Sequence, residues 1–414
     1  MAPNPMRTGS ARWLARLNFF LADVRDGLGP FLGVFLMGQG WQADDIGYVM
    51  AIAGIAGMAA TTPLGLLVDM SRSKRLLLAC GIVVLVLGNL ALWHDPSPAV
   101  TGMSQIATGI VGALVGPAVM GLTLGLVGQD GLARQLGVNE AWNHAGNLAA
   151  AALAGLAGYR WGLPAVFVVM LAMGAAALVC LQRIRPGDID HDVARGREAG
   201  AGEPGGPGHE SGPAGLSALA RSPSLLLLAV VMLLFHMGNA AMLPLLGQAV
   251  VARGDADPSV FTALTIVVAQ SVMIPVALLA GRQAGRHGYW PLVVVAMAAL
   301  PLRGLIAACW PSAWALIPVQ VLDGVGAGLL GVALPGLVAQ ILRGSGYVNA
   351  GLGAVMTVQG IGASLSPAIG GWIAQQFGYP AAFIVLGSFA LGSIAIWLGY
   401  AGALKPACAE RVMA

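Results

Sequence analysis

The feature that most limits how this chain can fold is a series of long apolar stretches that contain almost no charged residues. Of the 414 residues, 57% are hydrophobic and only 9% are charged. A water-soluble protein of this length would carry about a quarter charged residues. Because a membrane-spanning helix needs about 20 mostly apolar residues, such stretches predict an integral protein of the lipid bilayer.

Twelve stretches have this length and character, and we expect them to form transmembrane helices in two sets of six. Those of the first half are Leu14–Met37, Ile46–Val68, Leu76–Trp93, Val100–Leu126, Leu136–Ala157 and Ala165–Leu181. Those of the second half are Leu225–Val250, Phe261–Ala280, Pro291–Cys309, Trp314–Ile341, Ala350–Ile373 and Ala381–Leu404. We therefore predict an all-α membrane protein with six-helix bundles over residues 1–182 and 222–414. Residues 183–221, rich in Gly, Pro, Glu and Asp, are expected to form a flexible cytoplasmic linker.

The basic residues predict the orientation, because Lys and Arg collect in cytoplasmic loops. Of 21 such residues, two (Arg160 and Arg253) fall in one set of alternate loops and 17 in the other. The 17 are Arg7, Arg12, Arg16, Arg72, Lys74, Arg75, Arg134, Arg183, Arg185, Arg195, Arg197, Arg221, Arg282, Arg286, Arg343, Lys405 and Arg411. Arg25 and Arg303 lie inside predicted helices. We expect both termini in the cytoplasm and the protein in the inner membrane of a bacterial cell.

The two halves repeat one another at a shift of 216 residues. The aligned pairs are Gly137 with Gly353, Gly146 with Gly362, Gly155 with Gly371, Gly162 with Gly378 and Pro164 with Pro380. Parallel repeats of this kind are typical of secondary transporters that bind their solute near the middle of the membrane.

The loop after the second predicted helix carries a specific pattern, Gly65-Leu-Leu-Val-Asp69-Met-Ser-Arg72-Ser-Lys74-Arg75. Its glycine, leucine, aspartate and final basic pair resemble the loop signature of the major facilitator superfamily, and the resemblance extends over residues 13 to 404. It implies two six-helix bundles around a central cavity and transport by alternating access. It also implies that Asp69, Lys74 and Arg75 act at a cytoplasmic gate rather than as solute ligands.

A second copy of this loop follows the eighth predicted helix and reads Gly281-Arg-Gln-Ala-Gly285-Arg286-His-Gly288. It keeps Gly281, Arg286 and Gly288, but Gly285 stands where the signature has aspartate. The resemblance implies that Gly65, Gly281 and Arg286 belong to the same gate.

The eleventh predicted helix resembles a signature of exporters in this superfamily. Its matching residues are Gly353, Gly362, Ser366, Pro367, Gly370 and Gly371, with Ser366 in place of a glycine. In the family this signature belongs to the fifth helix, which here has glycines but no proline. Such glycines allow close helix packing, and Pro367 removes a backbone hydrogen bond, so we expect a bend there.

Ionisable residues inside the membrane are costly and usually face a cavity or a partner. The first predicted helix contains Asp23, Arg25 and Asp26, which we interpret as proton carriers with an arginine counter-charge. The alternative is a structural ion pair that fixes this helix. His144 is a further candidate for proton coupling, because histidine titrates near neutral pH, although it could instead be a packed hydrogen-bonding residue.

Amide side chains form a stripe on the fifth predicted helix, which also carries Glu140. Asn139, Asn143 and Asn147 recur every four residues, and we expect them to line the solute cavity, with helix–helix hydrogen bonding as the alternative. The cavity candidates of the second half are His236, Asn239, Gln270, Arg303, Asp323 and Gln359. Arg303 and Asp323 lie at similar depth, so they could pair, or Arg303 could bind an anionic solute.

The sequence contains no hydrolase, ATP-binding or metal-binding pattern, and its four cysteines are widely spaced. We therefore expect no enzymatic activity, cofactor, metal or nucleic-acid partner. We predict a monomeric secondary transporter that exports a small organic solute in exchange for protons. Import by symport or facilitation is the first alternative, because Gln105 stands where drug exporters of the family have arginine. A non-transporting sensor or intramembrane enzyme is the alternative of another class.

Overall fold

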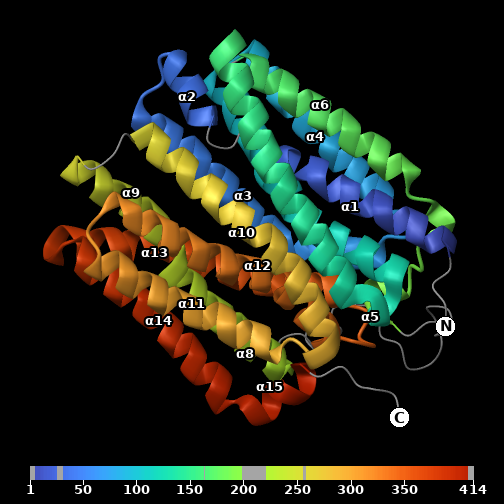
Figure 1. The fold of residues 1–414 in the computed structure, drawn as a ribbon. Helices are drawn as coiled ribbons and strands as arrows, with labels where there is room; N and C mark the ends of the chain where they lie inside the picture. Colours follow the sequence, from blue (N-terminus) through green and yellow to red (C-terminus); the bar gives the residue numbers. More distant parts are fainter. Residues whose placement is uncertain (1–4, 26–30, 163, 198–220, 255–257, 409–414) are drawn as a thin grey trace. The chain divides into compact units, whose positions relative to one another are not determined.

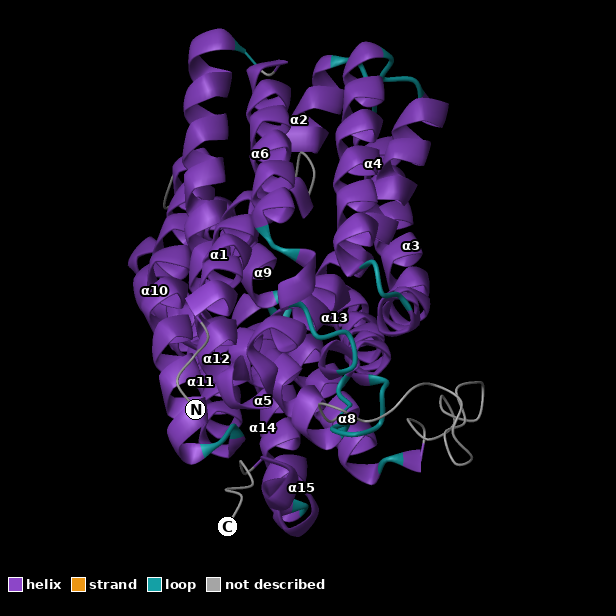
Figure 2. Ribbon diagram, turned by 90° about the vertical axis from the view of Figure 1, so that its right-hand side faces the viewer, coloured by secondary structure: helices purple, strands orange, loops and turns teal. Residues whose placement is uncertain are grey.

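A computed structural model describes residues 5–25, 31–162, 164–197, 221–254 and 258–408, and every regular element in these ranges is helical (Figures 1 and 2). Within the described residues, ten helical stretches are long and apolar enough to span a membrane. One of them, Pro98–Trp161, covers two of the predicted spans. The first predicted span includes residues 26–30, which lie outside the described residues. The predicted all-helical membrane fold is confirmed.

The chain divides into two compact units, which are described separately. Unit 1 comprises Met1–Gln135, Trp142–Glu203 and Leu342–Gly353. Unit 2 comprises Leu136–Ala141, Pro204–Ile341 and Ala354–Ala414. Two long helices, the fifth and the thirteenth in Figure 1, therefore contribute to both units. The bundle boundaries inferred from the sequence stay a prediction.

Unit 1 is built from helices that share one apolar core. They are α1 (Pro5–Arg25), α2 (Phe31–Gly38), α3 (Ala43–Met70), α4 (Lys74–His94), α6 (Pro164–Arg183) and most of α5 (Pro98–Trp161). Helix α1 packs along α6, and α4 contacts both. Leu14, Leu17 and Leu21 of α1 are buried in this core, at the three- and four-residue spacing that places side chains on one face of a helix.

Helix α5 is 64 residues long and contains one residue with non-helical dihedrals, Gly128. Its φ of +68° is readily adopted by glycine, which has no Cβ to clash in this region. The expected loop between Leu126 and Leu136 was therefore wrong in form, because the chain stays helical on both sides of one glycine.

Unit 2 contains the remaining long helices. They are α8 (Pro223–Asn239), α9 (Met242–Arg253), α10 (Pro258–His287), α11 (Trp290–Cys309), α12 (Leu316–Ile341), most of α13 (Val348–Phe377), α14 (Tyr379–Gly399) and α15 (Ala401–Cys408), with a 3-10 turn at Ala313–Ala315. Helix α11 packs against α12 and α14, α10 packs against α12, and α8 packs against α14. The seventh predicted span is interrupted at Ala240 and Ala241, between α8 and α9.

The predicted repeat is visible in the backbone where α5 and α13 end. Gly162 (φ 82°, ψ 170°) and Gly378 (φ 85°, ψ 163°) have nearly the same conformation. Each N–H group donates to the carbonyl four residues earlier, at 2.9 Å for Gly162 and 3.0 Å for Gly378. This aligned pair of the sequence repeat is confirmed as one structural motif used twice.

The first part of the predicted linker is ordered. Residues 184–197, here called the strap, contain 3-10 turns at Pro186–Asp188 and Val193–Arg195 and follow α6 in unit 1. The hydroxyl of Ser10 donates to the Asp188 carboxylate at 2.6 Å, and the Asp190 N–H donates to the carbonyl of Gly125 at 3.0 Å. Residues 198–220 of the predicted linker lie outside the described residues.

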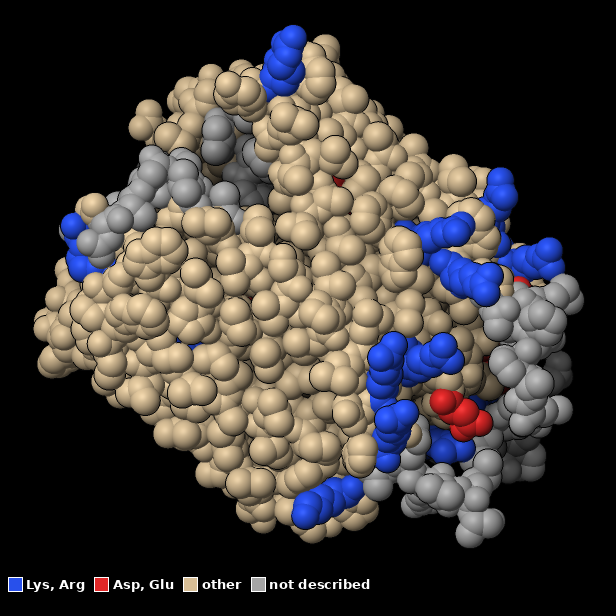
Figure 3. Space-filling model, in the orientation of Figure 1, with Lys and Arg blue, Asp and Glu red and all other residues tan. Residues whose placement is uncertain are grey.

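The surface agrees with a protein surrounded by lipid. A broad part of the face in Figure 3 has no charged side chain. Large apolar side chains are exposed on helices of both units, among them Leu87 (59%), Leu156 (63%) and Leu305 (53%). In water such a surface would be unfavourable, whereas in a bilayer it is in contact with acyl chains.

Candidate functional site

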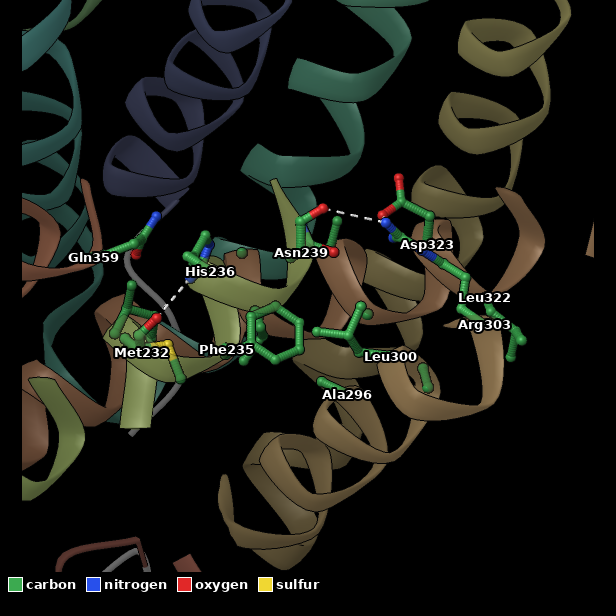
Figure 4. A pocket seen from close by; sticks show the side chains of 16 residues that line it. Met232, Phe235, His236, Asn239, Ala296, Leu300, Arg303, Leu322, Asp323 and Gln359 are labelled. Carbon is green, nitrogen blue, oxygen red and sulfur yellow. Dashed lines mark hydrogen bonds and ion pairs between the residues drawn. The ribbon is translucent and has the colours of Figure 1, made fainter. Parts of the chain in front are cut away.

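A cavity of about 200 Å³ lies within unit 2, between α8, α11, α12 and α13 (Figure 4). Its polar lining residues are His236, Asn239, Arg303, Asp323 and Gln359. All five are cavity candidates from the sequence. Apolar side chains, including Phe235 and Leu300, form much of the remaining wall.

Arg303 of α11 and Asp323 of α12 form a buried ion pair at this cavity. Their side chains are 3% and 19% exposed. The second terminal nitrogen of Arg303 donates to the backbone carbonyl of Asn239 at 3.3 Å. Because α8 ends at Asn239, this carbonyl is one of those that a helix leaves without a partner. Arg303 therefore stabilises the interruption of the seventh span as well as pairing with Asp323.

The other side of the interruption is also capped by a side chain. The N–H of Ala241, just before α9, donates to the buried hydroxyl of Ser366 in α13 at 2.9 Å. Ser366 is the residue that replaces a glycine of the exporter-like signature. Its hydroxyl thus satisfies a backbone donor that a glycine at this position would leave without this partner.

The cavity offers both donors and acceptors of hydrogen bonds. The Nδ1 atom of His236 lies 3.0 Å from the carbonyl of Met232, so Nδ1 carries the hydrogen and, in the neutral ring, Nε2 is an acceptor. Oε1 of Gln359 and Nε of Arg303 are buried and have no hydrogen-bond partner in the described structure. These atoms could bind a solute that enters the cavity.

Glu140 contacts the wall of the same cavity. It belongs to the short part of α5 in unit 2, and its carboxylate lies over Gly331 of α12, which lines the cavity. A Cβ atom added at Gly331 would be 3.1 Å from Oε2 of Glu140. Glu140 was not among the predicted site residues, although it is the only acidic residue of the predicted fifth helix. That isolation in an apolar span was the available signal.

The other predicted cavity and coupling residues lie elsewhere. Asn139 is buried in unit 2, whereas His144 is buried in unit 1 with Asn143 and Asn147 half-buried beside it in the sequence. Asp23 of unit 1 and Gln270 of unit 2 are half-buried. Asp26 lies outside the described residues, as does the side chain of Arg25.

The predicted gate aspartate, Asp69, binds the N-terminus of α13 within unit 1. Its carboxylate accepts from the N–H groups of Asn349 at 3.2 Å and Ala350 at 2.7 Å, and from the Asn349 side-chain amide at 2.7 Å. The first N–H groups of a helix have no acceptor within it, and the helix dipole favours negative charge there. Gly65 permits this approach, because a Cβ atom there would be 2.4 Å from the carbonyl oxygen of Asn349. Asn349 has no local sequence signal that would have identified it.

The basic gate candidates of unit 1 make different contacts. Lys74 is buried, and its Nζ donates to the carbonyl of Ser71 at 2.7 Å. Arg75 donates to the carbonyls of Leu181 and Gln182, each at 3.2 Å, and so caps the C-terminal end of α6.

In unit 2, the second loop copy has glycine packing without a carboxylate. A Cβ atom at Gly137 would be 2.9 Å from Cα of Gly281. Arg286 lies exposed in the last turn of α10.

Three glycines of the exporter-like signature lie in close contacts of α13. Cβ atoms at Gly353 and Gly362 would be 2.5 Å and 2.2 Å from the carbonyl oxygens of Thr61 and Leu233. At Gly370 a Cβ atom would meet Leu245 at 2.9 Å, whereas at Gly371 nothing lies within 4 Å. Pro367 lies inside α13, which remains one helix from Val348 to Phe377.

Comparison with known proteins identifies the family. The sequence matches the Major Facilitator Superfamily over residues 13–305 and 262–407. Two proteins described as uncharacterized MFS-type transporters, from two strains of Mycobacterium tuberculosis, are 40% identical over 389 residues, which cover 94% of this chain and 92% of theirs. Among solved structures, the transporter FucP in its outward conformation matches with a TM-score of 0.72 at 15% identity, covering 95% of this chain and 99% of FucP. The human organic anion transporter TETRAN matches with a TM-score of 0.66 at 14% identity, covering 95% and 100%.

The two structural matches have low sequence identity and therefore show the fold alone, whereas the sequence matches show the family. Membership agrees with the helical spans and the sequence repeat. The chain belongs to the major facilitator superfamily and is a multi-pass membrane protein, a secondary transporter rather than an enzyme.

Proposed function

We propose that this transporter exports a small polar solute in exchange for protons and that the solute binds in the cavity of unit 2. The observation that supports this proposal is the buried Arg303–Asp323 pair at a cavity whose wall also presents hydrogen-bonding atoms. Ionisable residues at membrane depth are expensive, so their presence at a cavity favours a role in binding or coupling.

The cavity favours a compact, hydrogen-bonding solute over a bulky or strongly charged one. Arg303 is balanced by Asp323, so the pair offers no net charge to an ion. Nε of Arg303 can donate, while Oε1 of Gln359 and Nε2 of His236 can accept. The volume of about 200 Å³ is below the ~300–1,000 Å³ of pockets for drug-sized ligands.

Competition at a carboxylate would couple the solute to protons. A solute that donates a hydrogen bond to Asp323 or Glu140 binds the ionised carboxylate, and protonation of that carboxylate would release it. Binding of proton and solute is then mutually exclusive, which is the requirement for exchange. The exporter-like glycines of α13 support the outward direction.

Import by proton symport is the second candidate, and Arg303 is the observation that favours it. If the solute accepts a hydrogen bond from Arg303, protonation of Asp323 would free the arginine for the solute, so the two would bind together. Gly285, in place of the second gate aspartate, also departs from the exporter pattern.

The direction of proton movement tests the proposal. The purified protein is reconstituted in proteoliposomes with a pH-sensitive dye and supplied with a panel of polyols, sugars, amino acids, organic acids and drugs. Proton release from the vesicles during solute entry supports exchange, and proton uptake with the solute supports symport. Asp323→Asn and Glu140→Gln should uncouple solute from proton flux, whereas Ser388→Ala on the exposed side of α14 serves as the control.

We also propose that Asp23, Arg25, Asp26 and His144 take part in proton coupling. Asp26→Asn should abolish proton-driven transport and leave passive solute exchange. Normal proton-driven accumulation in this variant would remove Asp26 from the mechanism.

The arrangement in the membrane remains part of the proposal. We propose a monomer in the bacterial inner membrane with both termini in the cytoplasm, on the strength of the basic-residue distribution. Labelling of single introduced cysteines near Arg160 and Arg343 with a membrane-impermeant thiol reagent in intact cells tests this. Labelling near Arg160 alone is the expected result.

A further inference from the structure

Unit 1 has a second hollow, of about 360 Å³, where α4 begins and α6 ends. It is separate from the cavity of unit 2 and contains no predicted solute ligand. One side is lined by basic and histidine side chains, and the strap contributes Pro186, Ile189 and His191. The other side is apolar and includes Leu76 and Leu178.

The polar side of this hollow carries positive charge without a local counter-charge. Arg72, Lys74 and Arg75 line it, and no acidic side chain is among its described lining residues. Arg72 is exposed, and Arg75 uses only Nε and one terminal nitrogen in its bonds to α6. Nδ1 of His191 is buried without a hydrogen-bond partner in the described structure. These groups together are suited to an anion.

The electrostatic environment of His191 agrees with this description. Burial lowers the pKa of His191 below its usual value, and the positive charges of Lys74, Arg195 and Arg72 lower it further. Asp190 acts in the opposite direction but does not reverse the shift. An anion bound here would relieve the repulsion between these groups.

The apolar side continues onto a surface suited to acyl chains. Leu76 at the start of α4 is 62% exposed, and Val83 and Leu87 lie on the same face of that helix at spacings of seven and eleven residues. On α6, Val179 is also exposed. The hollow therefore combines a basic end near the helix termini with an apolar track along two spanning helices.

We propose that this hollow binds the phosphate headgroup of an anionic phospholipid whose acyl chains lie along α4 and α6. Basic pockets between transmembrane helices recognise anionic headgroups by charge, and a soluble phosphate would use only the basic end. A zwitterionic lipid brings its own positive group, which the surrounding basic residues disfavour. The lipid would also tie α4 and α6 to the strap, which contacts the gate through the Ala194 carbonyl and the side-chain amide of Asn349 at 3.0 Å.

Native mass spectrometry of the purified full-length protein with equal amounts of phosphatidylglycerol and phosphatidylcholine tests this site. The wild type should retain phosphatidylglycerol preferentially. Arg72→Gln should reduce that preference about fivefold, the effect of one basic residue near an anionic lipid. Arg343→Gln, an exposed arginine of unit 1 outside the hollow, is the matched control and should keep it. Equal lipid preference in the wild type and Arg72→Gln would overturn the proposal.

A soluble-ligand arm distinguishes the two sources of phosphate. Inorganic phosphate and glycerol 3-phosphate are added at millimolar concentration before the lipid, and thermal unfolding and lipid retention are both measured. No change in either supports the lipid as the occupant. Stabilisation by inorganic phosphate with displacement of phosphatidylglycerol would overturn it in favour of a soluble anion. Circular dichroism of Arg72→Gln verifies that loss of binding is not loss of folding.

Discussion

The two repeats use the same glycine contacts but place their charges differently. Gly353 lies against the Thr61 carbonyl in unit 1, and Gly137 lies against the Ala277 carbonyl in unit 2. Both members of the second contact precede those of the first or follow them by 216 residues in the sequence. The close backbone approach is therefore a property of the repeat itself.

A second pair of contacts shows the same correspondence. Cβ atoms at Gly146 and Gly362 would be 2.0 Å and 2.2 Å from the carbonyl oxygens of Phe19 and Leu233. Glycine is required at such positions because any side chain would separate the two backbones. Helix packing in both repeats thus depends on equivalent small residues.

The charged residues do not follow this symmetry. Asp69 binds the start of α13 in unit 1, whereas the aligned position in unit 2 is Gly285. The buried Arg303–Asp323 pair belongs to unit 2. Packing is shared because both repeats must fold, while each charge serves a contact that occurs once. The predictions below alter first the unshared charges and then the shared glycines.

The largest effect is expected from separating the ion pair of unit 2. Arg303→Gln leaves Asp323 buried without its counter-charge, and Asp323→Asn does the same to Arg303. Each should lower the free energy of unfolding by about 3–5 kcal/mol. The double variant should recover much of this stability but not solute transport. Denaturant unfolding and proteoliposome flux measure the two properties, and a double variant no more stable than either single one would contradict the pairing argument.

A smaller loss is expected when the gate carboxylate of unit 1 is neutralised. Asp69→Asn retains one acceptor oxygen for three donors and removes the charge at the helix N-terminus. Hydrogen bonds to charged groups contribute about 1.5–3 kcal/mol, so the first turn of α13 should open more readily. Hydrogen exchange at Asn349 and Ala350 should accelerate. Gly285→Ala, at the aligned position with open space around it, is the control and should leave exchange there unchanged.

The shared glycines should give similar losses in the two units. Gly353→Ala and Gly137→Ala place a Cβ atom within 2.5 Å and 2.6 Å of a backbone oxygen, so a helix must shift. Overpacking of this kind costs about 1–3 kcal/mol. Both variants should unfold at lower temperature and transport more slowly, whereas Gly371→Ala should resemble the wild type. A loss in only one of the two would show that the contacts are not equivalent.

The sequence predicted the membrane fold, the family and the composition of the cavity more fully than the local breaks. Five predicted polar residues line one cavity because rare polar residues in apolar helices mark the few places that are not in contact with lipid. Whether they bind the solute stays a prediction. Glu140 was named in its helix but not selected, since the asparagine stripe next to it suggested a different face.

The interruption of the seventh span did have a sequence signal. Pro244 lacks an N–H group, so it cannot donate to the carbonyl of Ala240, and proline is favoured in the first turn of a helix. Helix α9 indeed begins at Met242. By contrast, no local pattern predicts that Arg75 caps α6 or that Asn349 binds Asp69. These contacts join residues more than a hundred positions apart and depend on the tertiary fold.

The strap was not foreseen for a similar reason. Its composition resembles that of a flexible segment, and its buried residues Ile184, Ile189 and Ala194 follow neither a helical nor a strand period. Burial of isolated apolar residues depends on the surface they meet, which sequence periodicity does not reveal.

The smallest expected effect is a pH dependence confined to the strap. Burial and the nearby charges of Lys74, Arg195 and Arg72 hold the pKa of His191 below 6.5, whereas in an opened strap the ring would regain its usual value. The open form therefore binds the proton more tightly than the closed form. Stability from neutral His191 is complete above pH 6.5 and declines as the pH falls below it.

Hydrogen exchange of residues 188–194, corrected for intrinsic rates, measures this at about pH 7.5 and about pH 5.5, on either side of the usual histidine value. Protection in the wild type should be lower at the acidic pH, and His191→Asn should remove the difference. His287→Asn, an exposed histidine at the end of α10, should leave the difference unchanged. Because the strap has basic neighbours and unit 2 offers no described segment of this kind after α14, an equal response of both units to acid would mean that the strap is not the element that titrates.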